Sequence, residues 1–569
     1  MDSAPTNGVD PDSNSDRSSH SFGARIRMRS LAMTPFAGWL SAVIAVGTLV
    51  RIPQLFHRLN EMHSFRQTQT AYVALEYARR GINPLHTPLP IFGPDADVPM
   101  ECPLPQAAAA VLIRLGLGSD AAMRIIGLIG FQAAAVLLAV LVFRWHGRLT
   151  ALVVVVLYEF SPFGLAWGAA ALIDFPAVAL ALGMVVGLDS WFRTASNVGL
   201  LTGSICAWMT ALVKATTLPA WCVLAGASAL AVYLTTRSLG RVAMGILAGP
   251  AVAVAVAMAW VRYGDSVKIQ NPSTVFLTSE NLRQWNFGTL GQRSHWAEYE
   301  PVLTRISDEI VGLSSVPPPL PLAIFGLLAF VVFGILAAPT WVERIRRAGW
   351  LGVAASAPML FFNLYQVHSY YLIAVFPAIV AVIGLGIVEV ARRIRGRFAV
   401  ALCVPVVFFN LNMAQSYFWT ALYPAIISTV TLGTVAAVQR LPRQASLVAL
   451  AGVAFVVTGS AAPQNLGQWT VSPQPDAGGE RLRAATRPDD LILVANCDWD
   501  PTTLYYADRR GLMLTRFTPD AWRRADISAY SYVYSCDPTA AVQQHLPPGY
   551  RVIPTSTTGL QRLVRASVP

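Results

Sequence analysis

The hydrophobic residues of this 569-residue chain are gathered into blocks, with short polar segments between them. A helix of about 20 apolar residues crosses the hydrocarbon core of a bilayer, which is about 30 Å thick. We therefore predict a polytopic α-helical membrane protein with about 13 transmembrane helices. The predicted spans lie at about residues 31–50, 121–143, 149–165, 172–192, 198–215, 217–235, 240–262, 317–338, 349–365, 369–391, 398–414, 418–438 and 444–461.

Two polar segments, residues 51–120 and 263–316, are too long to be simple turns between spans. In the first, residues 70–80 are predicted to form a short helix along the membrane interface. The proline-rich residues 84–105 should lack regular structure. Residues 106–117 are apolar but too short to span, so we expect a second interfacial or re-entrant helix there.

Arginines mark one side of the predicted bundle, because they fall on alternate loops. Cytoplasmic loops carry an excess of Lys and Arg, so we place these loops and the polar, disordered segment 1–30 in the cytoplasm. An odd number of spans within residues 31–461 then puts residues 462–569 outside, in a protein of the inner (plasma) membrane. The arginines are Arg144, Arg148, Arg193, Arg237, Arg241, Arg344, Arg346, Arg347, Arg392, Arg393, Arg395, Arg397, Arg440 and Arg443.

The polar C-terminal region, residues 462–569, is predicted to be a small extracytoplasmic α/β domain. Strand-like runs cover residues 491–495, 530–534 and 551–554, and a helix is expected over residues 538–545, with Asp537 as its N-cap. The region holds two cysteines, Cys497 and Cys536, which either form a disulfide or stay free as thiols.

Composition agrees with a membrane protein, since 54% of residues are hydrophobic and 13% are charged. Soluble domains carry about 25% charged residues. The net charge of +11 would favour nucleic acid as a partner of a soluble protein. Here the arginines lie between apolar blocks and serve topology, so we expect a lipid bilayer and no nucleic acid as partner.

Residues 61–72 (EMHSFRQTQTAY) are dense in polar groups directly after the first predicted span. Arg66 is a good bidentate partner for a phosphate or carboxylate, and Glu61 and His63 can titrate. Polar side chains beside a bilayer are costly and usually functional. Simple solvation or pairing is the plainer interpretation for one such loop, and it weakens because further candidates are predicted at the same face.

Two carboxylates are candidates for catalysis. Asp174 begins a predicted span just before Pro176, where it could cap the helix, serve the chemistry, or do both. Glu101 lies where the first loop returns to the bilayer and is either a general base, a cation ligand or a solvated side chain. Glu159 is near an outer span end and is expected to be structural.

Cations and aromatics complete the outer face. Lys214 ends a span there and either contacts an anion such as phosphate or snorkels to the headgroups. His368, Tyr370 and Tyr371 open another span, and they either bind phosphate or sugar or form part of an interfacial aromatic belt. In the second loop, Arg283, Trp285, Arg293 and Trp296 could stack on sugar, but an amphipathic interfacial helix is favoured.

Together these segments resemble the GT-C superfamily of lipid-linked glycosyltransferases, above all the family 39 and 83 type enzymes. These include protein O-mannosyltransferases and the transferases that add aminoarabinose to lipid A. The resemblance covers most of residues 50–390. It is carried by residues 63–71 (HSFRQTQTA), 101–104 (ECPL), 173–176 (IDFP), 213–216 (VKAT), 286–293 (NFGTLGQR), 368–371 (HSYY) and 505–508 (YYAD).

The resemblance implies a polyprenyl-phosphate-sugar donor and an extracytoplasmic lipid, glycan or protein acceptor. It leaves one gap, because the acidic residue of the family's first loop is matched here by Gln69, which cannot take a proton. Either Glu101, Asp174, His63 or Glu61 substitutes, with Glu101 or Asp174 favoured, or the protein has a different activity. The other expected substrate contacts are Arg66, Gln67, Gln69, Lys214, His368, Tyr370 and Tyr371.

The predicted activity is inverting sugar transfer by an integral membrane enzyme. The alternative is a transporter or flippase of lipid-linked sugars, which should carry polar residues at mid-bilayer depth. Ionisable groups instead gather at one end of the predicted spans, which favours the enzyme. No cofactor is certain, and a divalent cation is one option.

Overall fold

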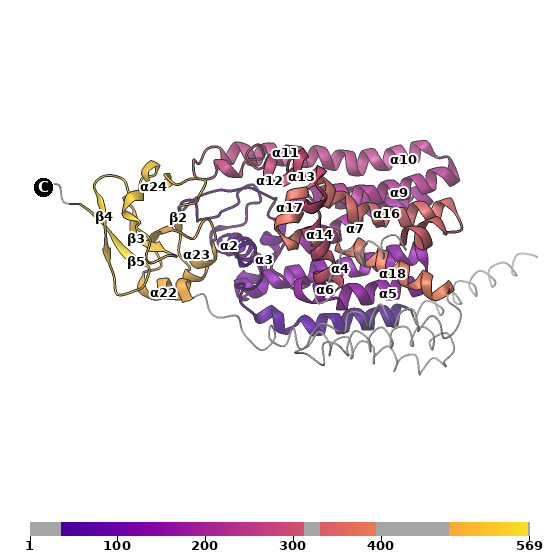
Figure 1. The fold of residues 1–569 in the computed structure, drawn as a ribbon, viewed down its shortest axis with the longest axis horizontal. Coiled ribbons are helices and arrows are strands. Elements are labelled where there is room, and N and C mark those ends of the chain that lie inside the picture. Colours follow the sequence, from indigo (N-terminus) through magenta and orange to yellow (C-terminus); the bar gives the residue numbers. More distant parts are fainter. Residues whose placement is uncertain (1–35, 312–329, 394–476, 567–569) are drawn as a thin grey trace, which may run out of the picture.

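The apolar blocks form a bundle of long helices that lie side by side, and a small sheet domain sits at one end of the bundle (Figure 1). This computed structural model describes residues 36–311, 330–393 and 477–566. Helix α2 and the loop that follows it lie between the bundle and the sheet domain. The segments with most polar residues therefore meet at one end of the molecule.

Within the part of the chain that the structure describes, five helices are long and apolar enough to cross a membrane. Each overlaps a predicted span, and α10 (Leu239–Ile246), the π-helical segment η2 (Leu247–Ala251) and α11 (Val252–Lys268) run on as one of them. The predicted spans at 398–414, 418–438 and 444–461, and most of 317–338, lie outside the described residues, so the total of about 13 stays a prediction. The five are Phe36–Phe56, α4 (Ser119–His146), α7 (Asp174–Thr194), α9 (Leu218–Thr236) and Leu239–Lys268.

Other predicted spans are helical with changed boundaries. The predicted span 149–165 is split into α5 (Arg148–Phe160) and α6 (Pro162–Trp167), because Pro162 cannot donate a backbone hydrogen bond and the Ser161 hydroxyl caps the new helix. The span predicted from residue 369 begins as a 3₁₀ turn, Ser369–Ala374, before α18 (Phe376–Arg393). Helices α8 (Asn197–Lys214) and α16 (Trp341–Leu360) fall where spans were predicted.

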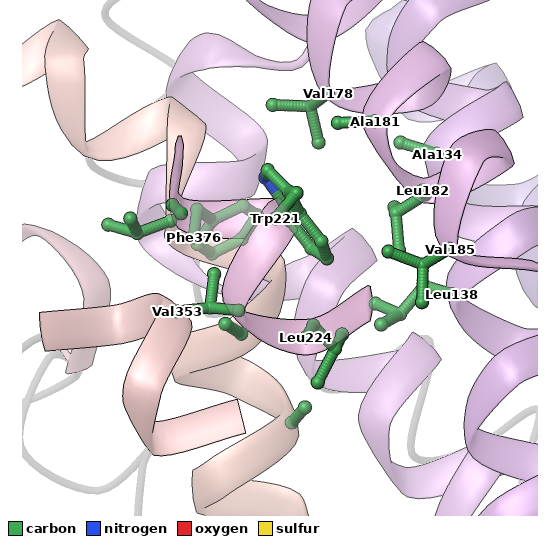
Figure 2. Close-up of a cluster of buried hydrophobic side chains, with 14 of the residues drawn as sticks. Ala134, Leu138, Val178, Ala181, Leu182, Val185, Trp221, Leu224, Val353 and Phe376 are labelled. Carbon is green, nitrogen blue, oxygen red and sulfur yellow. The ribbon is translucent and has the colours of Figure 1, made fainter. Parts of the chain in front are cut away.

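The core of the bundle is made by small, aliphatic and aromatic side chains of facing helices (Figure 2). Trp221 of α9 lies at its centre and donates its indole N–H to the carbonyl of Ala374 at 2.9 Å. Glycines allow the backbones to approach, since a Cβ at Gly187 of α7 would lie 2.6 Å from the nitrogen of Gly203 in α8. Close contact of this kind between small residues is how helices associate in a membrane.

Within the described residues, arginines of the predicted cytoplasmic loops lie at the end of the bundle away from the sheet domain, as Arg144 and Arg241 do. Arg144 donates to Ser190 Oγ at 3.0 Å and Arg241 to the Phe192 carbonyl at 3.2 Å. Helix α10, which carries Arg241, begins at that far end (Figure 1).

The first outer loop holds α2 (Ser64–Arg80) and α3 (Leu104–Arg114), with no helix or strand between them. Helix α2 begins six residues before its predicted start at residue 70, because His63 adopts a left-handed backbone (φ 51°) that turns the chain directly into it. The polar residues 66–70 are buried within this helix.

The single amphipathic helix predicted within residues 263–316 is wrong. In place of a single amphipathic helix there are three short helices, which are separated by turns at Gly288 and His295. Gly288 has φ 69° and so ends the first of them. The three are α12 (Arg283–Phe287), α13 (Leu290–Ser294) and α14 (Glu300–Arg305).

The sheet domain has five strands in the order β2-β1-β3-β5-β4, with β1 parallel to β2 and β3 and with β5 antiparallel to β3 and β4. Helices α22 (Ala477–Ala485), α23 (Thr502–Ala507) and α24 (Ala521–Arg524) accompany the sheet. The runs predicted for β1, β3 and β4 are strands. The five strands of the sheet are β1 (Leu491–Ala495), β2 (Gly511–Met513), β3 (Tyr530–Ser535), β4 (Tyr550–Pro554) and β5 (Leu560–Arg565).

The helix predicted over residues 538–545 is wrong. The Asp537 carboxylate accepts the backbone N–H of Thr539 at 2.9 Å, which closes a local turn instead of starting a helix. Only a 3₁₀ turn, Gln543–His545, follows.

Cys497 and Cys536 form a disulfide that joins the ends of β1 and β3. Because the bond closes a loop of 39 residues, replacing both cysteines by Ser should lower the free energy of unfolding of the sheet domain by about 4 kcal/mol. Thermal unfolding of the purified protein with and without reductant measures this. Equal midpoints, or two free thiols under non-reducing conditions, would contradict it.

Candidate active site

Helix α2 is clamped to the segment that leads into α7. The Gln67 side chain accepts the Ala171 N–H at 2.9 Å and donates to the Met62 carbonyl at 2.8 Å. Thr70 Oγ1 donates to the Ala171 carbonyl at 2.5 Å. Gln67 was predicted to contact substrate. Its side-chain amide instead hydrogen-bonds backbone groups and holds α2 near the start of α7.

The sheet domain supports α2 from the other side. Thr68 Oγ1 and Thr502 Oγ1 are 3.1 Å apart, and Tyr72 hydrogen-bonds the Arg509 carbonyl. The rings of Phe65 and Trp499 meet edge to face at 4.5 Å. The residues on either side of Arg66 are thus fixed by the rest of the fold.

Arg66 is the first cation of the cluster, and it forms an ion pair with Glu101. It also donates to Gln69 Oε1 at 2.7 Å. Burial lowers the pKa of Arg66. The surrounding groups, Glu101 first and then Tyr370, Tyr371 and Asp174, together outweigh burial and raise the pKa, so the guanidinium stays charged.

Glu101 is held in place through its two neighbours. The Cys102 N–H donates to the Leu212 carbonyl at 2.9 Å, and Trp260 donates to the Met100 carbonyl at 3.3 Å. The Glu101 side chain is 23% exposed, which is far more than its partner or Asp174. It is the carboxylate of the cluster that an incoming molecule can reach.

Lys214 and Asp174 form the second ion pair, at 2.7 Å between Nζ and Oδ1, where α8 ends and α7 begins. Both side chains are buried, and among the described residues neither makes a well-aligned hydrogen bond. Asp174 makes no side-chain cap, so its capping interpretation is wrong. Lys214 does not snorkel, because it is buried over the rings of Tyr370 and Tyr371 at 5.4 and 5.0 Å.

The two ion pairs belong to one cluster. Arg66 interacts electrostatically with Asp174, Tyr370 and Tyr371, the same three groups that surround Lys214. Two cations from different parts of the chain therefore share one set of partners. Each cation also has its own carboxylate.

His63 and His368 close the cluster. Their rings meet edge to face at 5.4 Å, and His63 lies 5.1 Å from the ring of Tyr370. Burial, followed by the field of nearby His63 and arginines, lowers the pKa of His368 to about 4. Burial and Arg305 also lower the pKa of His63. At neutral pH both rings are uncharged and offer hydrogen bonds to a ligand, without a positive charge.

The lowered pKa of His368 predicts acid sensitivity. Between pH of about 6.5 and 4, the unfolded chain would protonate this histidine while the folded protein keeps it neutral, so stability should fall as pH drops through that window. His368→Gln should flatten the fall, as measured by thermal unfolding between pH 7 and 5. The matched control is His295→Gln, at an exposed histidine of the same face. Equal slopes for wild type and His368→Gln would contradict this assignment.

Two other carboxylates discussed from the sequence lie outside this cluster, and one arginine near it was not singled out from the sequence. Glu61 forms an ion pair with Arg124, and Glu159 pairs with the fully buried Arg51 at 3.0 Å, as expected of a structural residue. Trp285, whose ring is 6.1 Å from that of His368, belongs to the second loop noted in the sequence. Arg305 was missed; it donates to the Tyr365 carbonyl at 2.8 Å, and no motif surrounds it in the sequence.

Across residues 36–311, 330–393 and 477–566, no group of three or more His, Cys, Asp and Glu side chains is placed to hold a metal ion. A divalent cation stays an expectation of the sequence.

Solved structures with the same fold exist, although no sequence-family model and no curated protein matches the chain. ArnT from Cupriavidus metallidurans, bound to undecaprenyl phosphate, superposes with a TM-score of 0.59 over 92% of this chain and 98% of that one, at 15% identity. This chain has the GT-C fold. The apo form of the same ArnT gives a TM-score of 0.47, with 93% of this chain and 97% of that one covered at 15% identity. The archaeal oligosaccharyltransferase AglB from Archaeoglobus fulgidus gives 0.45 at 12% identity, with coverage of 88% and 69%.

With that GT-C fold, the cluster lies at one end of the bundle, beneath the sheet domain. ArnT was solved with a polyprenyl phosphate and AglB with an inhibitory peptide and a dolichol phosphate. At this level of identity the likeness is one of fold. The chemistry has to be argued from the residues of this chain.

Proposed function

We propose that this protein is a membrane glycosyltransferase that moves a sugar from a polyprenyl-phosphate donor to an extracytoplasmic acceptor. The observation that carries the proposal is the convergence of Arg66 and Lys214 on one group of partners. Two cations in a largely buried site suit a phosphate, and the protein's GT-C fold is shared with an ArnT bound to undecaprenyl phosphate.

In the proposed reaction, an acceptor hydroxyl attacks the anomeric carbon of the donor sugar. The bond between that carbon and the phosphate oxygen breaks, and its electron pair stays on the phosphate. The hydroxyl attacks from the face opposite the phosphate, so the configuration inverts. Lys214 and Arg66 stabilise the charge that develops on the leaving phosphate. The neutral His368 ring donates an N–H to a phosphate oxygen.

Glu101 is our choice for the general base that removes the acceptor proton. Its side chain is 23% exposed, whereas the Asp174 side chain is 1% exposed and engaged with Lys214. A base must reach the proton that it takes, so geometry decides. Asp174 would then orient Lys214 toward the phosphate. Gln69 accepts a hydrogen bond from Arg66 and supports it as a neutral partner.

We further propose that the cluster and the sheet domain lie on the extracytoplasmic side of the inner membrane. Disulfides persist in oxidising compartments, and Cys497 and Cys536 are paired in this domain. The arginine-rich end of the bundle would face the cytoplasm, together with the N-terminus.

Transfer of radiolabelled sugar from a panel of polyprenyl-phosphate sugars, using purified protein in lipid vesicles, tests the proposal. Release of free polyprenyl phosphate together with a labelled acceptor supports it. Movement of intact donor across the bilayer, without its consumption, would instead make the protein a flippase and overturn the proposal.

A further inference from the structure

A groove runs along the outside of the bundle between α4, α7 and α8, and it has a volume of about 500 Å³. It extends from Ala179, in the second turn of α7, to Ser190 and Ser196 at the end away from the sheet domain. Val198, which lines it, is 70% exposed, so the groove opens onto the surface of the bundle. Its lining is mostly apolar and includes Leu137, Gly183, Gly187, Val198, Thr202 and Cys206.

Small side chains create this space. A Cβ at Gly183 would lie 2.9 Å from Cys206 Sγ, and Gly187 touches the backbone of Gly203. Helices α7 and α8 therefore pack closely at their glycines, and the groove runs along this contact. An apolar groove at this depth faces the acyl chains of a bilayer, not water.

The end of the groove is basic. Arg144 lies there and donates to Ser190 Oγ at 3.0 Å and to the Val186 carbonyl at 3.2 Å. The buried Asp189 lies 3.8 Å from Arg144 and 3.6 Å from Arg193, and Arg346 also interacts with it. Arg346 also interacts with Glu343, so three arginines face two carboxylates and the local charge is +1.

We propose that this groove binds an anionic phospholipid of the leaflet at the arginine-rich end. One acyl chain would lie in the groove, and the phosphate would sit against Arg144. Basic pockets between membrane helices favour anionic headgroups over neutral ones, so charge complementarity selects this occupant. Ser190 follows Asp174 by 16 residues on α7, which separates this site from the catalytic cluster by about 24 Å.

Native mass spectrometry of the full-length protein in mixed vesicles of phosphatidylglycerol and phosphatidylcholine tests this. The wild type should retain phosphatidylglycerol in preference. Arg144→Gln should weaken that retention by about five-fold, the effect of one cation near a charged headgroup. The matched control is Arg237→Gln, because Arg237 lies at the same end, contacts Tyr233 and does not line the groove.

A second variant fills the groove. Thr202→Phe, at an exposed lining position, should reduce retention of the lipid while lipid-free thermal unfolding stays as in wild type. The proposal is overturned if Arg144→Gln and Arg237→Gln behave alike, if both lipids are retained equally, or if Thr202→Phe changes nothing. Absence of any retained lipid, as when another span of the chain covers the groove, also overturns it.

Discussion

Glu101→Gln is expected to lower the rate of sugar transfer by a factor of about 10² to 10⁴. The amide keeps the shape of the carboxylate and can still accept a hydrogen bond from Arg66, but it cannot take the acceptor proton. Binding of polyprenyl phosphate should change little, because Arg66 and Lys214 are untouched. The measurement is single-turnover transfer at saturating donor, with donor binding measured alongside.

The matched control is Glu300→Gln, which removes an exposed carboxylate from the second outer loop. It should transfer sugar at the wild-type rate. If Glu101→Gln also transfers at that rate, Glu101 is not the base. Loss of transfer in Asp174→Asn, with unchanged donor binding, would then move the role to Asp174.

Breaking the buried Lys214–Asp174 pair should have the second large effect. Lys214→Met leaves a buried carboxylate without its cation, and removal of one partner of such a pair costs about 3–5 kcal/mol of stability. Thermal and denaturant unfolding measure this loss. Binding of polyprenyl phosphate should weaken as well, because one of the two cations proposed to hold the phosphate is gone.

The double variant Asp174→Leu with Lys214→Met separates the two effects. Apolar replacement of both partners is often neutral for stability, so the unfolding midpoint should return toward wild type. Phosphate binding should stay weak, because Lys214 is still absent. Recovery of both properties would show that the pair is structural and that Lys214 does not hold the phosphate.

The helices of the bundle were predictable because their signal is local. A block of about 20 apolar residues has one stable solution in a bilayer. The misses occur where local signals are weak or compete. Strand β2 has only three residues, and the turn closed by Asp537 overrides the helix that Pro538 would otherwise start.

The residues of the site were largely predictable by type and position, but their pairing was not. Arg66 meets Glu101 after 35 residues, and Asp174 meets Lys214 across two helix ends. Glu61 is two residues from His63, yet the chain turns at His63 and the Glu61 carboxylate pairs with Arg124. Such partners depend on how separate segments pack, which periodicity along the chain does not encode.

The central claim is that Arg66 and Lys214 together hold the phosphate of a polyprenyl carrier. A structure of the protein with bound polyprenyl phosphate tests this most directly. The account predicts phosphate oxygens within about 3 Å of Lys214 Nζ and of the Arg66 guanidinium, beside His368. A phosphate bound at another part of the protein, with both ion pairs of the cluster unchanged, would contradict it.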